Sequence, residues 1–189
     1  RGIATHRALG ALDVAAFTGL GDREMKQKLQ EALDKIAVKG ILRRKEREAL
    51  DETALLAFLK SDLARRMAQS PQRRREWPFT LKVEAGMLLQ GVLDACFLEA
   101  GEWVLVDYKT DRGDPATLRE KYPPQMRWYM RALRDITGLP VKEAWLYLLS
   151  RREAVRVTED APIRLRPGLS LPAPSEQDRM KGEKEGLHL

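Results

Sequence analysis

The chain has 189 residues, of which 43% are hydrophobic and 33% are charged, and its formal net charge is +6. This balance is typical of a folded globular protein, and it excludes a chain that is disordered throughout. No apolar run of about 18 residues is present, which excludes a membrane-spanning helix, and the positive charge favours a polyanionic partner without identifying one.

The first seventy residues predict helices. Apolar residues at helical spacing predict a short helix over 3–17 and an amphipathic helix over 23–38, which a glycine ends. A second, longer helix is predicted over 44–69, where a serine–proline pair ends it. Together these segments are expected to form an N-terminal helical subdomain of about residues 1–70.

After residue 75 the apolar spacing changes to the two-residue repeat of strands. Strands are predicted in five segments: 77–83, 87–99, 103–109, 141–149 and 155–157. Short turns join the first three, so these are expected to form an antiparallel meander. A helix is predicted over 125–137, because a proline pair precedes it and Gly138 follows it. The fold class is therefore α/β, with a core of about residues 75–158 behind the helical subdomain.

Residues 1–159 are expected to form a single domain. Prolines recur after Asp160 and the last residues are polar, so 160–189 are predicted to form a flexible tail. The chain does not begin with Met, and the first residues lack the apolar core of a signal peptide. We therefore expect a processed product or a piece of a longer protein.

The single cysteine, Cys96, limits the kinds of site that cysteines can form in this chain. One thiol excludes an intrachain disulfide, a four-cysteine zinc site and a cysteine-held iron–sulfur cluster. The position of Cys96 in a strand-like stretch predicts a small packed side chain rather than a nucleophile. Low cysteine usage is typical of a reducing compartment, so the expected location is the cytoplasm.

Two aspartates and a lysine stand out in the strand segments. Asp94 interrupts an otherwise apolar strand, and Asp107 closes the apolar run before Lys109. A carboxylate inside a strand is costly unless it is paired or binds a cation, and carboxylate oxygens are ligands that Mg²⁺ or Mn²⁺ prefers. Asp107 and Lys109 are two residues apart, so both side chains point to one sheet face. The trio predicts a metal site with an ammonium beside it; the alternative is a surface Asp–Lys pair at a strand end.

A wider pattern runs through LLQGVLDACFLEAGEWVLVDYKTDR and PPQMRWYMRAL: Gly-x-x-Asp, then Asp-x-Lys-Thr, then Gln-x-x-x-Tyr. It resembles the nuclease domain of the RecB/AddA group of the PD-(D/E)XK superfamily. The matching residues are Gly91, Asp94, Asp107, Lys109, Thr110, Gln125 and Tyr129. REWPFTL and a Gly-x-x-x-His near the start extend the resemblance, which covers about residues 75–150 and 2–13. The segment 22–69 carries no motif of this group.

The resemblance implies a PD-(D/E)XK restriction-endonuclease-like core, with a mixed central sheet flanked by helices, and a metal-dependent DNA nuclease. The implied metal ligands are His6, Asp94, Asp107 and the main-chain carbonyl of Tyr108. The implied catalytic residues are Asp94, Asp107, Lys109, Gln125 and Tyr129. In this scheme Gln125 and Tyr129 orient Lys109 or contact the DNA backbone. The implied cofactor is Mg²⁺ or Mn²⁺, and a histidine ligand makes Mn²⁺ more acceptable.

Several of these residues also have plainer explanations. Without the resemblance, His6 would be an ordinary packed or surface histidine on a helix, and Tyr129 would belong to the buried face of an ordinary helix. The carboxylates of Glu76 and Glu84 rank behind the other ligand candidates. Basic residues near the motifs are candidates for salt-sensitive phosphate contacts: Arg112, Arg119, Lys121 and Arg127.

The expected function is hydrolysis of DNA phosphodiester bonds, as an exonuclease, by the nuclease domain of a helicase–nuclease in double-strand-break repair and recombination. The implied partners are DNA, a covalently attached helicase domain and a second protein chain as partner subunit; no membrane is implied. Two alternatives stay open. One is a non-catalytic DNA-binding or docking module on the same fold, and the other is a stand-alone nuclease of the superfamily.

Overall fold

The computed structural model describes residues 2–82, 88–111, 117 and 122–157. Its centre is a five-stranded sheet in the order β1-β2-β3-β4-β5. The strands are β1 (Arg73–Lys82), β2 (Leu88–Glu99), β3 (Glu102–Lys109), β4 (Val141–Leu148) and β5 (Glu153–Val157). The first three are antiparallel neighbours, β4 is parallel to β3, and β5 is antiparallel to β4. The sheet is mixed, which confirms the α/β class and the predicted meander.

Helix α7 (Pro123–Thr137) makes the crossover that joins the parallel strands β3 and β4. Prolines occupy its first turn, where a missing backbone donor costs little. Gly138 ends it in the left-handed conformation at φ 68°. The predicted helix over 125–137 is therefore confirmed, with a start two residues earlier.

The N-terminal region is helical. Its elements are α1 (Gly2–Ala11), the 3₁₀ turn η1 (Val14–Phe17), α2 (Asp22–Val38), α3 (Arg44–Glu48), α4 (Glu52–Leu59) and α5 (Asp62–Gln69). The helix predicted over 23–38 is confirmed as α2. The single helix predicted over 3–17 is wrong, because Asp13 accepts a hydrogen bond from the Ala15 backbone at 3.2 Å and starts a separate turn.

The single helix predicted over 44–69 is also wrong, since three helices fill this segment. Asp51 accepts a hydrogen bond from the Ala54 backbone at 2.9 Å, and Ser61 accepts one from Ala64 at 3.2 Å. Each side chain satisfies a free donor at a helix start, so each begins a new helix. The apolar spacing continues across both breaks, and for this reason the pattern looks like one helix.

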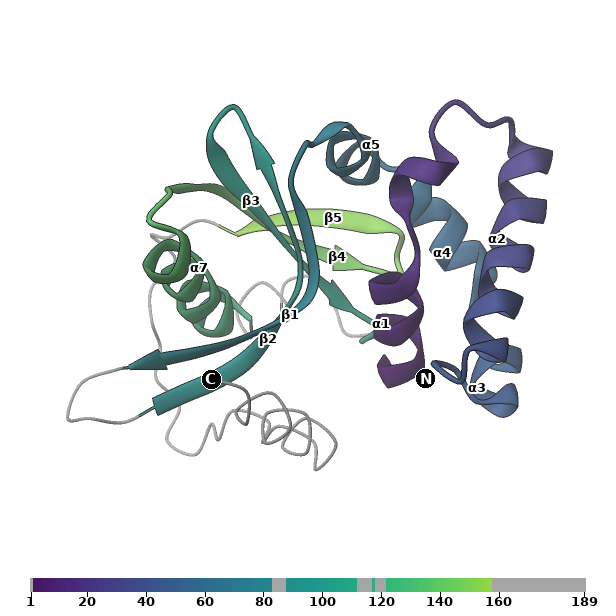
Figure 1. Ribbon diagram of the computed structural model, residues 1–189, viewed down its shortest axis with the longest axis horizontal. Helices are drawn as coiled ribbons and strands as arrows, with labels where there is room; N and C mark the ends of the chain where they lie inside the picture. The colour runs from purple at the N-terminus through teal and green to yellow at the C-terminus, as the bar shows by residue number, and fades with distance from the viewer. Residues whose placement is uncertain (1, 83–87, 112–116, 118–121, 158–189) are drawn as a thin grey trace, which may run out of the picture.

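The sheet is packed on both faces, with the N-terminal helices on one side and α7 on the other (Figure 1). On the helical side, Phe58 and Leu55 from α4 join Phe97, Val104 and Val106 of the sheet in one core. A second core on the other face combines α7 with apolar residues of all five strands. The two cores explain why β3 is apolar on both faces, as buried strands are.

Cys96 belongs to the second core and is fully buried. Burial raises the pKa of its thiol to about 12, so the prediction of a packed, unreactive side chain is confirmed. Every helix in the described ranges is too short or too polar to cross a bilayer. The tail predicted over 160–189 lies outside the described residues.

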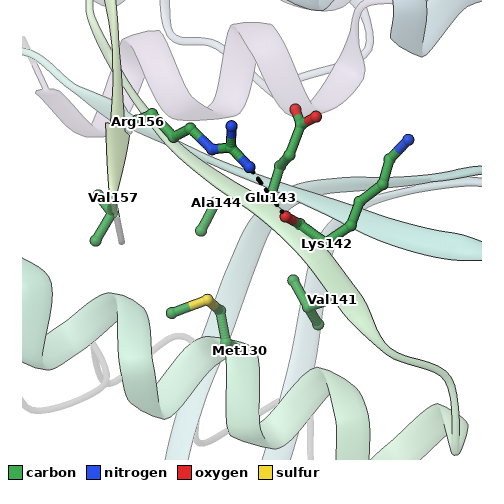
Figure 2. Close-up of a pocket in the computed structure, with 7 residues that line it drawn as sticks. All are labelled: Met130, Val141, Lys142, Glu143, Ala144, Arg156 and Val157. Carbon is green, nitrogen blue, oxygen red and sulfur yellow. Dashed lines mark hydrogen bonds between the residues drawn. The ribbon is translucent and has the colours of Figure 1, made fainter. Parts of the chain in front are cut away.

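A hollow of about 220 Å³ lies between α7 and the strands β4 and β5 (Figure 2). Met130, Val141 and Val157 supply its apolar lining, and on its strand side Arg156 donates a hydrogen bond to the Lys142 carbonyl. Val141 pairs with the first part of β3, whereas the motif residues lie at the opposite end of that strand. The hollow is therefore separate from the candidate site.

Candidate active site

Asp94 and Asp107 lie opposite each other at the end of the β2–β3 ladder. The ladder reaches Ala95 and Val106, and the two aspartates are the next residues along their strands. Among the described residues they are the buried acidic ones, with exposed fractions of 8% for the Asp94 residue and 3% for the Asp107 residue. The structure thus brings together the two carboxylates that the sequence singled out.

Asp94 is held by two groups from different parts of the chain. The Tyr108 backbone N–H donates to Asp94 Oδ2 at 2.8 Å, and His6 Nδ1 lies 3.0 Å from Asp94 Oδ1. Burial by itself lowers the pKa of His6, but the hydrogen bond and negative charge of Asp94 raise it above the usual value. In a strand the N–H and C=O of one residue point to the same side, so the Tyr108 carbonyl also points toward β2.

Glu76 of β1 also lies beside Asp94. The register that pairs Arg75 with Ala95 and Trp77 with Leu93 places Glu76 level with Asp94. One ligand atom from each of His6, Glu76 and Asp94 lies within 4.8 Å of the others. Helix α1 and the strands β1 and β2 therefore contribute to one cluster. The sequence placed Glu76 behind the other ligand candidates, because its position opposite Asp94 depends on the β1–β2 register.

Asp107 and Lys109 form the second half of the site. Lys109 Nζ lies 2.7 Å from Asp107 Oδ2, yet Oδ2 accepts no aligned hydrogen bond from the described residues. The contact is therefore an ion pair without hydrogen-bond geometry. Burial, followed by the negative charge of Asp94, raises the pKa of Asp107 to about 7, although Lys109 opposes the shift.

Helix α7 supplies the residues that hold Lys109. The ammonium donates to Gln125 Oε1 at 3.0 Å, and Gln125 Nε2 donates to the Tyr129 hydroxyl at 2.7 Å. One helical turn separates Gln125 from Tyr129, so both face the sheet. Burial raises the pKa of Tyr129 to about 12, which keeps its hydroxyl protonated. The Gln-x-x-x-Tyr motif is a hydrogen-bonded relay that ends on Lys109.

The two motif glycines lie at close approaches between elements. A Cβ on Gly91 would lie 2.7 Å from the Phe79 ring, and that ring packs edge-on against Tyr129 at 5.5 Å between centroids. A Cβ on Gly2 would lie 3.0 Å from Thr110 Oγ1. Gly91 therefore makes room for the packing behind the α7 relay, and Gly2 lets α1 approach the end of β3.

The donor set fits a divalent metal ion. The His6 imidazole and the carboxylates of Glu76 and Asp94 lie together, and Asp107 is near enough to Asp94 for their charges to interact. Hard oxygen ligands with one nitrogen suit Mg²⁺ or Mn²⁺. The buried Asp107 Oδ2, without a hydrogen bond in the described part of the chain, is the polar atom that such an ion would satisfy.

The basic residues near the motifs are placed only in part. Arg127 extends from α7 and has a buried Nε without a hydrogen-bond partner in the described ranges. The other candidates for phosphate contacts, Arg112, Arg119 and Lys121, lie outside the described residues, as does Glu84.

Comparison with known proteins agrees with this geometry. A family model described as the PD-(D/E)XK nuclease superfamily matches residues 1–185. A Clostridium kluyveri relative, whose name describes one subunit of an ATP-dependent helicase/nuclease, is 32% identical over 80% of this chain and 13% of its own length. Relatives of the same name in Heliobacterium modesticaldum and Carboxydothermus hydrogenoformans are each 34% identical, over 79% and 65% of this chain and 12% of their own lengths.

The chain therefore spans about an eighth of the length of the relatives that it matches. The match to the family model covers nearly the whole chain, including both aspartates, the lysine and the α7 relay. The chain belongs to the PD-(D/E)XK nuclease superfamily.

Proposed function

We propose that this chain hydrolyses phosphodiester bonds in DNA with the help of a divalent metal ion. The observation that carries the proposal is the buried Asp107, whose Oδ2 lacks an aligned hydrogen bond from the described residues and lies 2.7 Å from Lys109 Nζ. Burial and the negative charge of Asp94 both make a charged Asp107 costly, and Lys109 offsets this only in part. A cation bound between Asp94 and Asp107 offsets that cost, and Lys109 then lies beside it.

Each residue of the site has its own role in this proposal. The metal ligands in this proposal are His6, Asp94, Asp107 and the Tyr108 carbonyl, with Glu76 as an addition. When bound, the ion supplies a Lewis acid that activates water and offsets charge on the phosphate. Lys109 stabilises negative charge that develops on the phosphate. Gln125 orients Lys109, and Tyr129 orients Gln125.

Mg²⁺ is the proposed ion, because carboxylate oxygens are its preferred protein ligands. His6 adds a nitrogen, which extends the proposal to Mn²⁺. The relatives' name suggests the setting: we propose a nuclease domain of a helicase–nuclease, with a partner subunit, that acts as an exonuclease in double-strand-break repair and recombination. Residues 1–159 would form this domain, and the cytoplasm stays the expected location.

Asp107→Asn tests the function directly. The change keeps the size of the side chain but removes the charge that binds the cation, so metal-dependent cleavage is expected to fall by about a thousandfold or more. The measurement is cleavage of labelled single- and double-stranded DNA with Mg²⁺, with Mn²⁺ and with EDTA.

The matched control is Asp135→Asn, which removes an exposed carboxylate of α7 that pairs with Arg131 at 3.7 Å. It is expected to cleave like the wild type. Full activity of Asp107→Asn would contradict the assignment. A wild-type chain that neither cleaves DNA nor binds Mg²⁺ or Mn²⁺ in calorimetry would favour a non-catalytic DNA-binding module.

A further inference from the structure

The ammonium of Lys109 is contacted from a third direction, by the ring of Tyr122. Lys109 Nζ lies 4.3 Å from the centroid of that ring, in addition to its contacts with Asp107 and Gln125. A cation over an aromatic face is attracted by the ring quadrupole, most strongly where water is excluded. Only 14% of the Lys109 side chain is exposed, so water is largely excluded here.

Asp111 holds the Tyr122 ring in this position. The Tyr122 hydroxyl donates a hydrogen bond to Asp111 Oδ2. The backbone of Asp111 is itself anchored, because the Ser150 hydroxyl donates to its carbonyl at 2.7 Å. Next to it, the Leu149 N–H donates to the Lys109 carbonyl at 2.9 Å. The turn after β4 thus fixes the backbone at the end of β3. Through the carboxylate of Asp111, this fixed backbone also holds the Tyr122 ring in place.

We propose that Tyr122 is a positioning residue for Lys109 and that Asp111 positions Tyr122. This inference rests on the proposed function, because it gives the pair a part in the same cleavage step. The Lys109 ammonium sits on a flexible four-carbon chain, so its position depends on the contacts made by its end. The ring restricts the side-chain conformations open to Lys109, so that Nζ stays beside Asp107 while substrate binds.

The variants separate the ring from the hydroxyl. Tyr122→Leu removes both, Tyr122→Phe keeps the ring, and Asp111→Ala removes the acceptor of the hydroxyl. The matched control is Trp128→Leu, which removes an α7 ring that lies against Arg131 at 5.5 Å and not against Lys109. All are made in the full chain, with circular dichroism and thermal unfolding to follow folding.

Cleavage kinetics give the first measurement. Tyr122→Leu is expected to lower kcat by about three- to thirtyfold, while KM for DNA and the Mg²⁺ concentration for half-maximal activity change by less than about twofold. Tyr122→Phe should recover most of kcat because it keeps the ring. Asp111→Ala and Tyr122→Phe remove the same hydrogen bond, so the double variant should lose no more than either single variant.

The second measurement does not depend on cleavage. An amine-acetylating reagent, with mass spectrometry to count the modified lysines, reports how accessible the Lys109 amine is. The exposed Lys28 serves as the internal reference. Labelling of Lys109 is expected to rise most in Tyr122→Leu and to stay low in Trp128→Leu. Asp111→Ala and Tyr122→Phe keep the ring and lose the same hydrogen bond, so both should show the same, smaller rise.

Unchanged kcat together with unchanged Lys109 labelling in Tyr122→Leu overturns the inference. An equal loss of kcat in Trp128→Leu overturns it as well, because the effect would then be one of general packing. If Tyr122→Leu does not fold, Asp111→Ala and Tyr122→Phe supply the labelling test, and unchanged Lys109 labelling in both then overturns the inference. A wild-type chain without metal-dependent cleavage contradicts the proposed function, while the labelling comparison still decides the inference.

Discussion

Glu76 reaches the candidate metal cluster through a backbone conformation that is rare for its residue type. Its φ is 47°, in the left-handed region where a side chain meets the following carbonyl. Such strain costs on the order of 1–2 kcal/mol, and it persists where the surrounding structure enforces it. Gly10 of α1 provides the room, because a Cβ there would lie 2.4 Å from Glu76 Cγ.

Gly10→Ala is therefore expected to displace the Glu76 carboxylate without touching Asp94 or Asp107. The Mg²⁺ concentration for half-maximal cleavage should rise several-fold, because one carboxylate leaves the cluster, with kcat at saturating Mg²⁺ changed much less. Titration of cleavage against Mg²⁺ measures both quantities.

Gly21→Ala is the matched control for this change. It adds the same methyl group 3.5 Å from Glu24 Oε2, at the start of α2. Its Mg²⁺ requirement should equal that of the wild type. A Gly10→Ala variant with an unchanged Mg²⁺ requirement would show that Glu76 does not contribute to metal binding.

At the scale of elements, α4 packs against the strand residues next to the site. The Phe58 ring packs edge-on against Tyr108 at 5.0 Å and against Tyr147 at 4.9 Å between centroids. Tyr108 lies between Asp107 and Lys109, and its N–H binds Asp94. The helical segment 22–69, which carries no recognised motif, thus contributes the apolar wall that fixes the end of β3.

The break between α4 and α5 is held by Ser61, whose hydroxyl caps the start of α5. Ser61→Ala is expected to lower the free energy of unfolding by about 1 kcal/mol, because the Ala64 N–H loses its partner. Urea denaturation measures this loss, and Ser61→Asp, which restores an acceptor, should recover most of it. If the two variants are equally stable, the cap does not hold the break.

Helix α5 is tied to the sheet by charges. Arg66 donates to Glu99 at 2.7 Å and lies 2.9 Å from Glu143, and Lys142 also donates to Glu99. The hydrogen bond from Arg66, followed by that from Lys142, lowers the pKa of Glu99 to about 2. A carboxyl whose pKa is lower in the folded chain stabilises the fold above its usual pKa, and this contribution is lost as pH falls toward 2.

Glu99→Gln should therefore cost about 1 kcal/mol of unfolding free energy at neutral pH, a modest value because Glu99 is partly exposed. The difference from the wild type should shrink between about pH 5 and pH 2. Urea midpoints across this range measure it. Glu48→Gln, in an exposed pair with Arg44, is the control and should show almost no difference at any pH. A constant Glu99→Gln difference down to pH 2 would contradict this account.

At the scale of the whole molecule, the fold brings the carboxylates of Asp94, Asp107 and Glu76 close to His6. The pKa of His6 is raised and that of Asp107 is raised to about 7, so both groups bind protons more tightly in the folded chain than in the unfolded chain. The metal-free protein should thus lose stability as pH rises from about 4 to 7 through Asp107, and above about 6.5 through His6.

A metal ion reverses this trend because it binds the deprotonated forms. The increase in melting temperature produced by Mg²⁺ should therefore be larger at about pH 8 than at about pH 6. Below the pKa of a ligand, the ion must displace its proton, and each such proton weakens Mg²⁺ binding by up to about tenfold per pH unit. Thermal unfolding at both pH values measures this. Asp107→Asn should show little Mg²⁺ effect at either pH, and a Mg²⁺ effect that is equal at both pH values would contradict the assignment of these ligands.

Local patterns were sufficient for most elements and for the central trio. Asp94 and Asp107 stand out because a charge in an apolar strand is visible without knowledge of its neighbours, and alternation and turns predict β1 to β3. The breaks at Asp51 and Ser61 were missed because polar capping residues also occur inside helices, and the apolar spacing continues through them.

By itself, the sequence determined the α/β class, the aspartate pair with Lys109, and the Gln-x-x-x-Tyr helix, because these depend on residue type and short spacing. Only the tertiary structure decided which distant groups meet. It placed Glu76 beside Asp94 through the β1–β2 register, Phe58 behind Tyr108, and the Tyr122 ring over Lys109. Such contacts depend on register and packing between segments far apart in the chain, which no local pattern encodes.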